Sequence, residues 1–121
     1  MIYVTDLARM RAFYAACGGL QVVDDASEHC TLATEGWELT LVLVPADVAA
    51  GIEVATPPVR RASAPVKLGV PVEDLVAAID AVEELGGVVD DRDEAWSYRG
   101  TRRRDVLDPE GNVVQLVAPG G

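Results

Sequence analysis

Two parts of the chain repeat each other, and this duplication restricts the possible folds more than any other sequence feature. Residues 4–7 (Val-Thr-Asp-Leu) correspond to residues 72–75 (Val-Glu-Asp-Leu) at an offset of 68 residues. A pair of glycines follows each Asp after twelve residues. A Val-Val-Asp-Asp sequence follows each pair, with two extra residues before it in the first copy. Three matches in the same order indicate a duplicated structural unit.

Each copy predicts the same series of elements. Asp6 and Asp74 stand where a helix N-terminus favours a hydrogen-bond acceptor and a negative charge, and the glycine pairs are typical helix ends. Apolar residues at helical spacing lie between them: Leu7, Met10, Tyr14 and Cys17 in the first copy, and Leu75, Ile79, Val82 and Leu85 in the second.

Strands are expected on both sides of each helix. One short strand precedes each helix, at residues 2–4 and 66–72, where apolar residues alternate with others in the second copy. Three more follow in each copy, at residues 20–23, 31–34 and 37–44, and at residues 88–90, 101–107 and 113–117. Each unit is therefore a β-α-β-β-β module, and the fold class is α+β.

The stretch between the copies has the composition of a linker. It contains Pro57, Pro58 and Pro65, which stiffen a chain and end regular structure. We expect one domain over residues 1–121, with module one at about 1–45, the linker at about 46–65 and module two at about 66–121. A module of this size buries little surface alone, so the two should pack together, within one chain or across a dimer.

Composition and charge exclude several classes of protein. The 121 residues are 50% hydrophobic and include only two cysteines, which excludes a disordered chain and a disulfide scaffold. Apolar stretches such as residues 39–44 are far too short to span a membrane, and residues 1–6 lack the features of a signal peptide. We expect a soluble cytoplasmic domain. The net charge of −10 disfavours nucleic acid as a partner and would attract cationic ligands.

Several motifs resemble those of the vicinal oxygen chelate superfamily. They are residues 4–7 with Phe13-Tyr14, residues 70–75 with Leu85-Gly86-Gly87, and above all residues 107–116, Leu-Asp-Pro-Glu-Gly-Asn-Val-Val-Gln-Leu. The superfamily includes glyoxalase I, extradiol dioxygenases, fosfomycin-resistance enzymes and bleomycin-resistance proteins. The resemblance implies two βαβββ modules whose strands form a curved mixed sheet around a cleft, in a homodimer.

The resemblance also implies where a metal would be bound. In metal-dependent members, each module supplies a His seven residues before the helix-opening Asp and a Glu in its last strand. In module two these positions fall on Lys67 and Gln115. In module one the early position would precede Met1, and we place the late one on Glu38. A protonated Lys repels cations and Gln is a weak ligand, so we expect no metal and no cofactor.

The same positions suggest what the cleft contains instead of a metal. We hypothesise that the ammonium group of Lys67 partly replaces the charge of the metal and pairs with Glu38. The alternative is that Lys67 reaches solvent at a strand edge. Trp37, Trp96 and Tyr98 are expected to border the cleft, the last two from a loop over residues 93–99. There they could stack on a planar ligand or a cation, or else pack in the core or a dimer interface.

The arginines gather in the strand that follows this loop. Arg102 and Arg104 would share one strand face and could line the cavity, while Arg103 would point away. The alternative is a solvated strand face.

The remaining candidate groups point to no catalytic residue. The single His29 is expected at the surface, and Cys17 and Cys30 in the core.

These observations favour a non-catalytic protein that sequesters a planar or cationic metabolite or antibiotic, as bleomycin-resistance proteins do. One alternative is a metal-dependent lyase, isomerase or dioxygenase of the same superfamily, whose missing ligands would have to come from elsewhere. A variant of it is a metal-free enzyme that uses Glu38 as a general base. Another is a regulatory domain without a ligand.

Overall fold

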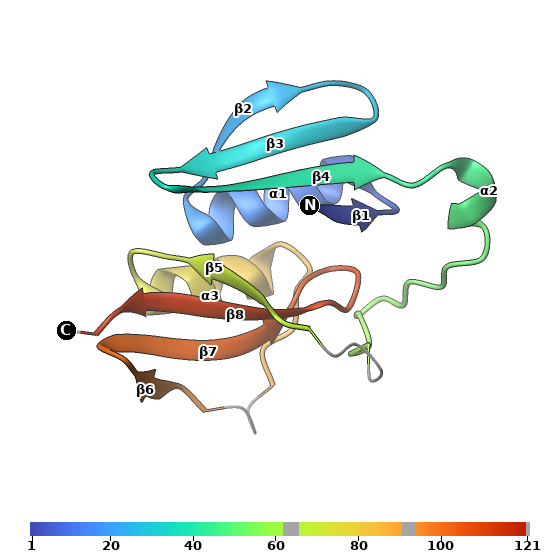
Figure 1. Ribbon diagram of the computed structural model, residues 1–121. Helices are drawn as coiled ribbons and strands as arrows, with labels where there is room; N and C mark the ends of the chain where they lie inside the picture. Colours follow the sequence, from blue (N-terminus) through green and yellow to red (C-terminus); the bar gives the residue numbers. More distant parts are fainter. Residues whose placement is uncertain (62–65, 91–93, 121) are drawn as a thin grey trace.

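The computed structural model describes residues 1–61, 66–90 and 94–120 and contains two modules of the same architecture (Figure 1). Module one consists of β1 (Ile2–Val4), α1 (Leu7–Gly18), β2 (Gln21–Asp25), β3 (His29–Thr34) and β4 (Trp37–Leu43). The short helix α2 (Ala46–Ala49) follows it. Module two consists of β5 (Leu68–Pro71), α3 (Leu75–Glu84), β6 (Trp96–Tyr98), β7 (Thr101–Leu107) and β8 (Val113–Pro119).

Each module forms its own mixed sheet. The strand orders are β1-β4-β3-β2 and β5-β8-β7-β6. In both sheets the first strand pairs in parallel with the last, and the other neighbours are antiparallel. The predicted α+β fold with two βαβββ modules is confirmed.

Helix caps explain where both long helices begin. The side chain of Asp6 accepts a hydrogen bond from the Arg9 amide at 3.1 Å, and Asp74 accepts one from the Val76 amide at 2.9 Å. Each bond satisfies an amide that the first turn of a helix leaves free. After α1 the chain turns through Gly19 at φ 62°, a conformation that glycine adopts without strain.

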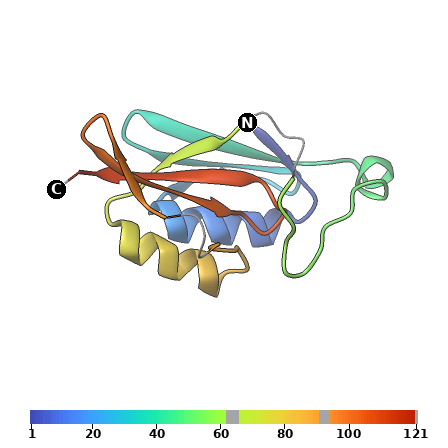
Figure 2. The ribbon, with the colours of Figure 1, turned by 90° about the horizontal axis from the view of Figure 1, so that it is seen from below.

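Both long helices cover the same side of the two sheets, and they pack against each other there (Figure 2). A single buried cluster contains residues of both modules, so the modules share one core. The face of each sheet that points away from α1 and α3 carries no helix; we call it the open face. Among the described residues, no helix is long and apolar enough to cross a membrane.

The turn between β7 and β8 joins the modules through buried polar contacts. Asp108 is fully buried and accepts a 2.6 Å hydrogen bond from the hydroxyl group of Tyr14 in α1. The carboxylate of Glu110 accepts hydrogen bonds from the amides of Thr5 at 2.9 Å and Asp6 at 3.1 Å. One turn of module two therefore fixes both α1 and the chain entering it.

One predicted strand of module two is wrong. Residues 88–90 do not form a strand: Val88 makes a single antiparallel bridge to Leu107, and the outer strand is instead β6. Trp96 and Tyr98, which we expected in a loop, are therefore strand residues with fixed directions. The first loop residue, Asp93, lies outside the described residues, as do residues 62–65 of the linker.

Candidate functional site

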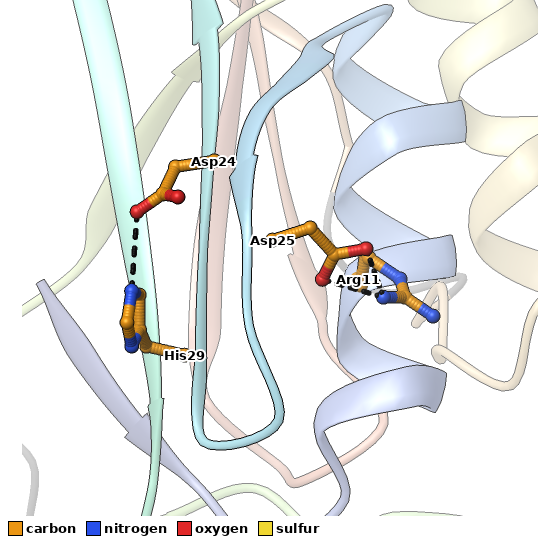
Figure 3. A network of polar contacts seen from close by, with 4 residues as sticks. All are labelled: Arg11, Asp24, Asp25 and His29. Carbon is orange, nitrogen blue, oxygen red and sulfur yellow. Dashed lines mark hydrogen bonds and ion pairs between the residues drawn. The ribbon is translucent and has the colours of Figure 1, made fainter.

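The alternation of side chains along each strand decides which residues reach the open face. On β2, neighbouring residues illustrate this (Figure 3): Asp25 binds Arg11 of α1 at 2.8 Å, whereas Asp24 points the other way and contacts His29 at 3.1 Å. His29 is exposed, as predicted.

Four polar side chains meet on the open face of module two. The ammonium group of Lys67, just before β5, contacts the carboxylate of Asp105 on β7 at 2.5 Å. On the same face, the guanidinium group of Arg103 donates to the side-chain oxygen of Gln115 at 2.6 Å. Asp105 and Gln115 are register partners on β7 and β8, which brings the two pairs side by side.

Two aromatic side chains from β6 complete this group. The Lys67 ammonium nitrogen lies 5.8 Å from the ring centre of Trp96, and the Arg103 guanidinium carbon lies 5.0 Å from that of Tyr98. These distances are within the range of cation–π attraction. Tyr98 is 53% exposed. We call Lys67, Trp96, Tyr98, Arg103, Asp105 and Gln115 the open-face cluster. Lys67, Trp96, Tyr98 and Gln115 were expected near each other, but Arg103 and Asp105 were missed.

The expected orientation of the arginines is reversed. Register pairs Arg103 with Val117 and Asp105 with Gln115, so these residues share the open face. Arg102 and Arg104 therefore point to the helix side of β7. There Arg102 donates to the Ser97 hydroxyl group, and Arg104 donates to the Asp90 carbonyl oxygen.

Trp37 does not border the open face. It is half-buried at the start of β4 and packs against the shared core, on the same side as the buried Leu39 and Leu41. For Trp37 the structure therefore supports the alternative prediction, packing against the core.

Glu38 lies on the open face but does not pair with Lys67. It stands near the start of β4, next to the hairpin pair Thr34 and Trp37. Thr34 and Pro71 line one cavity, so this end of β4 lies by the end of β5, whereas Lys67 precedes the start of β5. The modules thus place Glu38 and Lys67 at opposite ends of β5, and Asp105 is the carboxylate within reach.

The register also corrects the position that matches Gln115 in module one. Ile2 and Val70 are equivalent in the repeat, and they pair with Leu41 and Leu116. The equivalent of Gln115 is therefore Thr40, not Glu38. The hydroxyl group of Thr40 is hydrogen-bonded to that of Thr31 at 2.9 Å.

The residues at the positions that the sequence resemblance assigns to metal ligands do not fit a metal ion. They are an ammonium group paired with a carboxylate, an amide paired with a guanidinium group, and a hydroxyl group. Two nearby cations would repel a metal, and the amide oxygen is already used by Arg103. Within the described ranges, no group of three or more His, Cys, Asp or Glu side chains could hold a metal ion.

One cavity in the described structure lies away from this cluster. It measures about 370 Å³ and opens between the end of α1 and the start of α3, with Cys17 in its lining. Burial, followed by the charge of Asp108, raises the pKa of Cys17 to about 12. The thiol therefore stays protonated near neutral pH, which makes it a poor nucleophile. A smaller cavity of about 140 Å³ borders the open-face cluster, with Arg60, Asp105 and Val113 in its lining.

The chain is similar to a known protein family in sequence and to solved structures in fold. Residues 1–117 match the family model of the glyoxalase-like domain. No curated protein sequence matches the chain.

Solved structures share the fold at low sequence identity. A glyoxalase/bleomycin resistance protein/dioxygenase family enzyme from Burkholderia phytofirmans has a TM-score of 0.67 at 18% identity, covering 98% of this chain and 94% of that one. A glyoxalase/bleomycin resistance protein from Albidiferax ferrireducens has a TM-score of 0.65 at 18% identity, covering 98% and 93%. The fosfomycin resistance protein FosX from Listeria monocytogenes has a TM-score of 0.64 at 12% identity, covering 97% and 87%.

Proposed function

Because the chain belongs to the glyoxalase-like domain family, we propose that it is a small-molecule binding protein that holds a planar metabolite or antibiotic without metal chemistry. The binding surface is the open-face cluster of module two. The observation that carries this proposal is the pairing of Lys67 with Asp105 and of Arg103 with Gln115, at and beside the positions that the sequence resemblance assigns to metal ligands.

The aromatic residues of β6 support a planar ligand. Trp96 and Tyr98 alternate with Ser97, so both rings lie on the open face. The half-exposed ring of Tyr98 offers a flat apolar surface beside hydrogen-bond donors. A few polar groups beside aromatic surface are typical of small-molecule sites. A metal-dependent reaction would need ligands that these positions do not supply.

We expect a ligand to change the fluorescence of Trp96 in the presence of EDTA. In a Trp37→Phe background, Trp96 is the remaining tryptophan of the sequence, so a panel of planar metabolites and drugs can be screened by its emission. Hits should keep their affinity when EDTA removes trace metals.

The matched control for this screen is the reverse variant, Trp96→Phe, in which Trp37 on the core side reports instead. It should show no comparable response. If every hit required added nickel, zinc, manganese or iron(II), the metal-dependent alternative would replace our proposal.

We also propose that the chain forms a homodimer in which the second copy borders the open face and leaves the open-face cluster accessible to a ligand. The face of each sheet that points away from α1 and α3 carries no helix, so a partner chain can approach it. Sedimentation equilibrium should give the mass of two chains, and a monomer at all concentrations would contradict this arrangement.

A further inference from the structure

The hydrogen bonds of the open-face cluster leave it with an excess of donors. Arg103 has five N–H groups, and its described bonds use two of them, to Thr101 at 2.9 Å and to Gln115 at 2.6 Å. Lys67 has three N–H groups, one of which points to Asp105.

Gln115 adds further donors because Arg103 fixes its amide. Its side-chain oxygen accepts from the guanidinium group, so the amide NH₂ group is the part that remains for a ligand. Gln115 would bind a metal ion through its side-chain oxygen. Here that oxygen is occupied by Arg103, so Gln115 can instead donate its NH₂ group to a hydrogen-bond acceptor on a ligand.

The charges of the open-face cluster also favour a ligand that accepts hydrogen bonds, because their sum is positive. Lys67 and Arg103 carry two positive charges, and Asp105, which is 8% exposed, carries one negative charge close to Lys67. The cluster is thus locally positive in a chain whose net charge is −10. One negative charge on a ligand neutralises the net positive charge of the cluster. A second would meet no further uncompensated positive charge there and would be repelled by a chain of net charge −10.

We infer that the open-face cluster binds a planar aromatic monocarboxylate. Its carboxylate accepts from Arg103 and Gln115, with Lys67 at the edge, and its ring lies against Tyr98 and Trp96. A guanidinium group matches the two oxygens of a carboxylate, and its cation–π contact with Tyr98 holds it beside the ring surface. This inference rests on the proposed function and specifies its ligand class. It replaces the cationic ligand that the net charge alone suggested.

The test uses three probes that share one ring system. Calorimetry should detect binding of 2-naphthoate, at least tenfold weaker binding of the neutral 2-naphthamide, and no binding of 2-naphthylmethylamine. The affinity for naphthoate should fall as salt is added, because screening weakens the charge interaction. Equal affinity for the amide, or tighter binding of the amine, would overturn the inference.

The strand itself supplies a matched pair of variants. Arg103→Gln should weaken naphthoate binding at least tenfold, and Arg103→Lys should restore only part of the loss, since an ammonium group cannot form two parallel bonds. Arg102→Gln removes the same charge from the other face of β7 and should change affinity less than twofold. Similar losses in both variants would show that net charge, not this site, attracts the probe.

The two proposals fail in different ways. If naphthoate does not bind but another ligand of the Trp96 screen does, the carboxylate inference is wrong and the binding function stands. If neither naphthoate nor any compound of the screen affects Trp96, both are wrong. Circular dichroism and thermal melting check that each variant is folded.

Discussion

Replacing Asp108 with alanine should lower the free energy of unfolding by about 3–5 kcal/mol, because it removes a buried carboxylate together with several hydrogen bonds to a charged group, each worth about 1.5–3 kcal/mol. Asp108 is fully buried and accepts four hydrogen bonds. Its donors are the Tyr14 hydroxyl group, the amides of Glu110 and Asn112, and the Asn112 side chain. The substitution leaves all four donors without this acceptor, and each buried unsatisfied group costs about 1–3 kcal/mol.

Urea denaturation measures this loss of stability. If Asp108→Ala fails to fold, two milder variants still test the contribution of these hydrogen bonds. Tyr14→Phe removes one donor and should cost about 1 kcal/mol. Asp108→Asn keeps the shape but presents an NH₂ group to other donors, so its cost should lie between those of the other two variants. The control is Asp80→Ala on the exposed side of α3, with an effect of about 0.5 kcal/mol or less. Equal effects at Asp80 and Asp108 would show that the turn does not hold the modules together.

The internal repeat predicted most of the fold because its signals are local. Asp6 and Asp74 cap their helices through hydrogen bonds to amides two or three residues away, so no distant contact is needed to place them. The strand β6 could not be located in this way. It has three residues and, in the part of the chain that the structure describes, pairs only with β7, so its position depends on register with a neighbour.

The open-face cluster was predicted only in part, because alternation along a strand shows which residues share a face but allows either face to point to the helices. The sequence shows that Arg102 and Arg104 share a face, but it does not show which face contacts the helices. Val106 and Leu107 are both apolar at the end of this strand, so either alternation would bury one of them. The structure buries Val106 in the shared core, and Arg103 therefore lies with Asp105 on the open face.

The error at Glu38 has a related cause. The pairs Glu38-Leu39 and Gln115-Leu116 look alike, but strand register in the two modules makes Thr40 the equivalent of Gln115. A displacement of two residues keeps Glu38 on the open face and moves it along the strand by about 7 Å. The sequence thus predicted its face and misplaced it along β4, which is why the pair with Lys67 does not form.

Stability should fall steeply as the pH rises above 9, because two buried acidic groups ionise more readily in the unfolded chain. Burial, then the charge of Asp108, raises the pKa of Cys17 from 9.0 to about 12, and the same causes raise the pKa of Tyr14 well above 10.0. Below pH 9 both states keep these protons and stability is unaffected. Between pH 9 and 12 the unfolded chain loses the Cys17 proton while the folded chain retains it. Each pH unit then costs about 1.4 kcal/mol, or about 4 kcal/mol in all.

Urea denaturation at half-unit steps from pH 8 to 11, under reducing conditions, tests whether stability falls with rising pH and whether Cys17 and Tyr14 cause the fall. Cys17→Ala should make the decline above pH 9 shallower, and Tyr14→Phe should do so above pH 10. Part of the decline should remain in Cys17→Ala, because burial also raises the pKa of Cys30. Tyr3→Phe is the control, because it removes a hydroxyl group from a side chain that is 66% exposed instead of from a buried one. If wild type and Cys17→Ala lost equal stability between pH 8 and 10, the Cys17 thiol would not be buried as the structure shows, and the end of α1 would pack differently against module two.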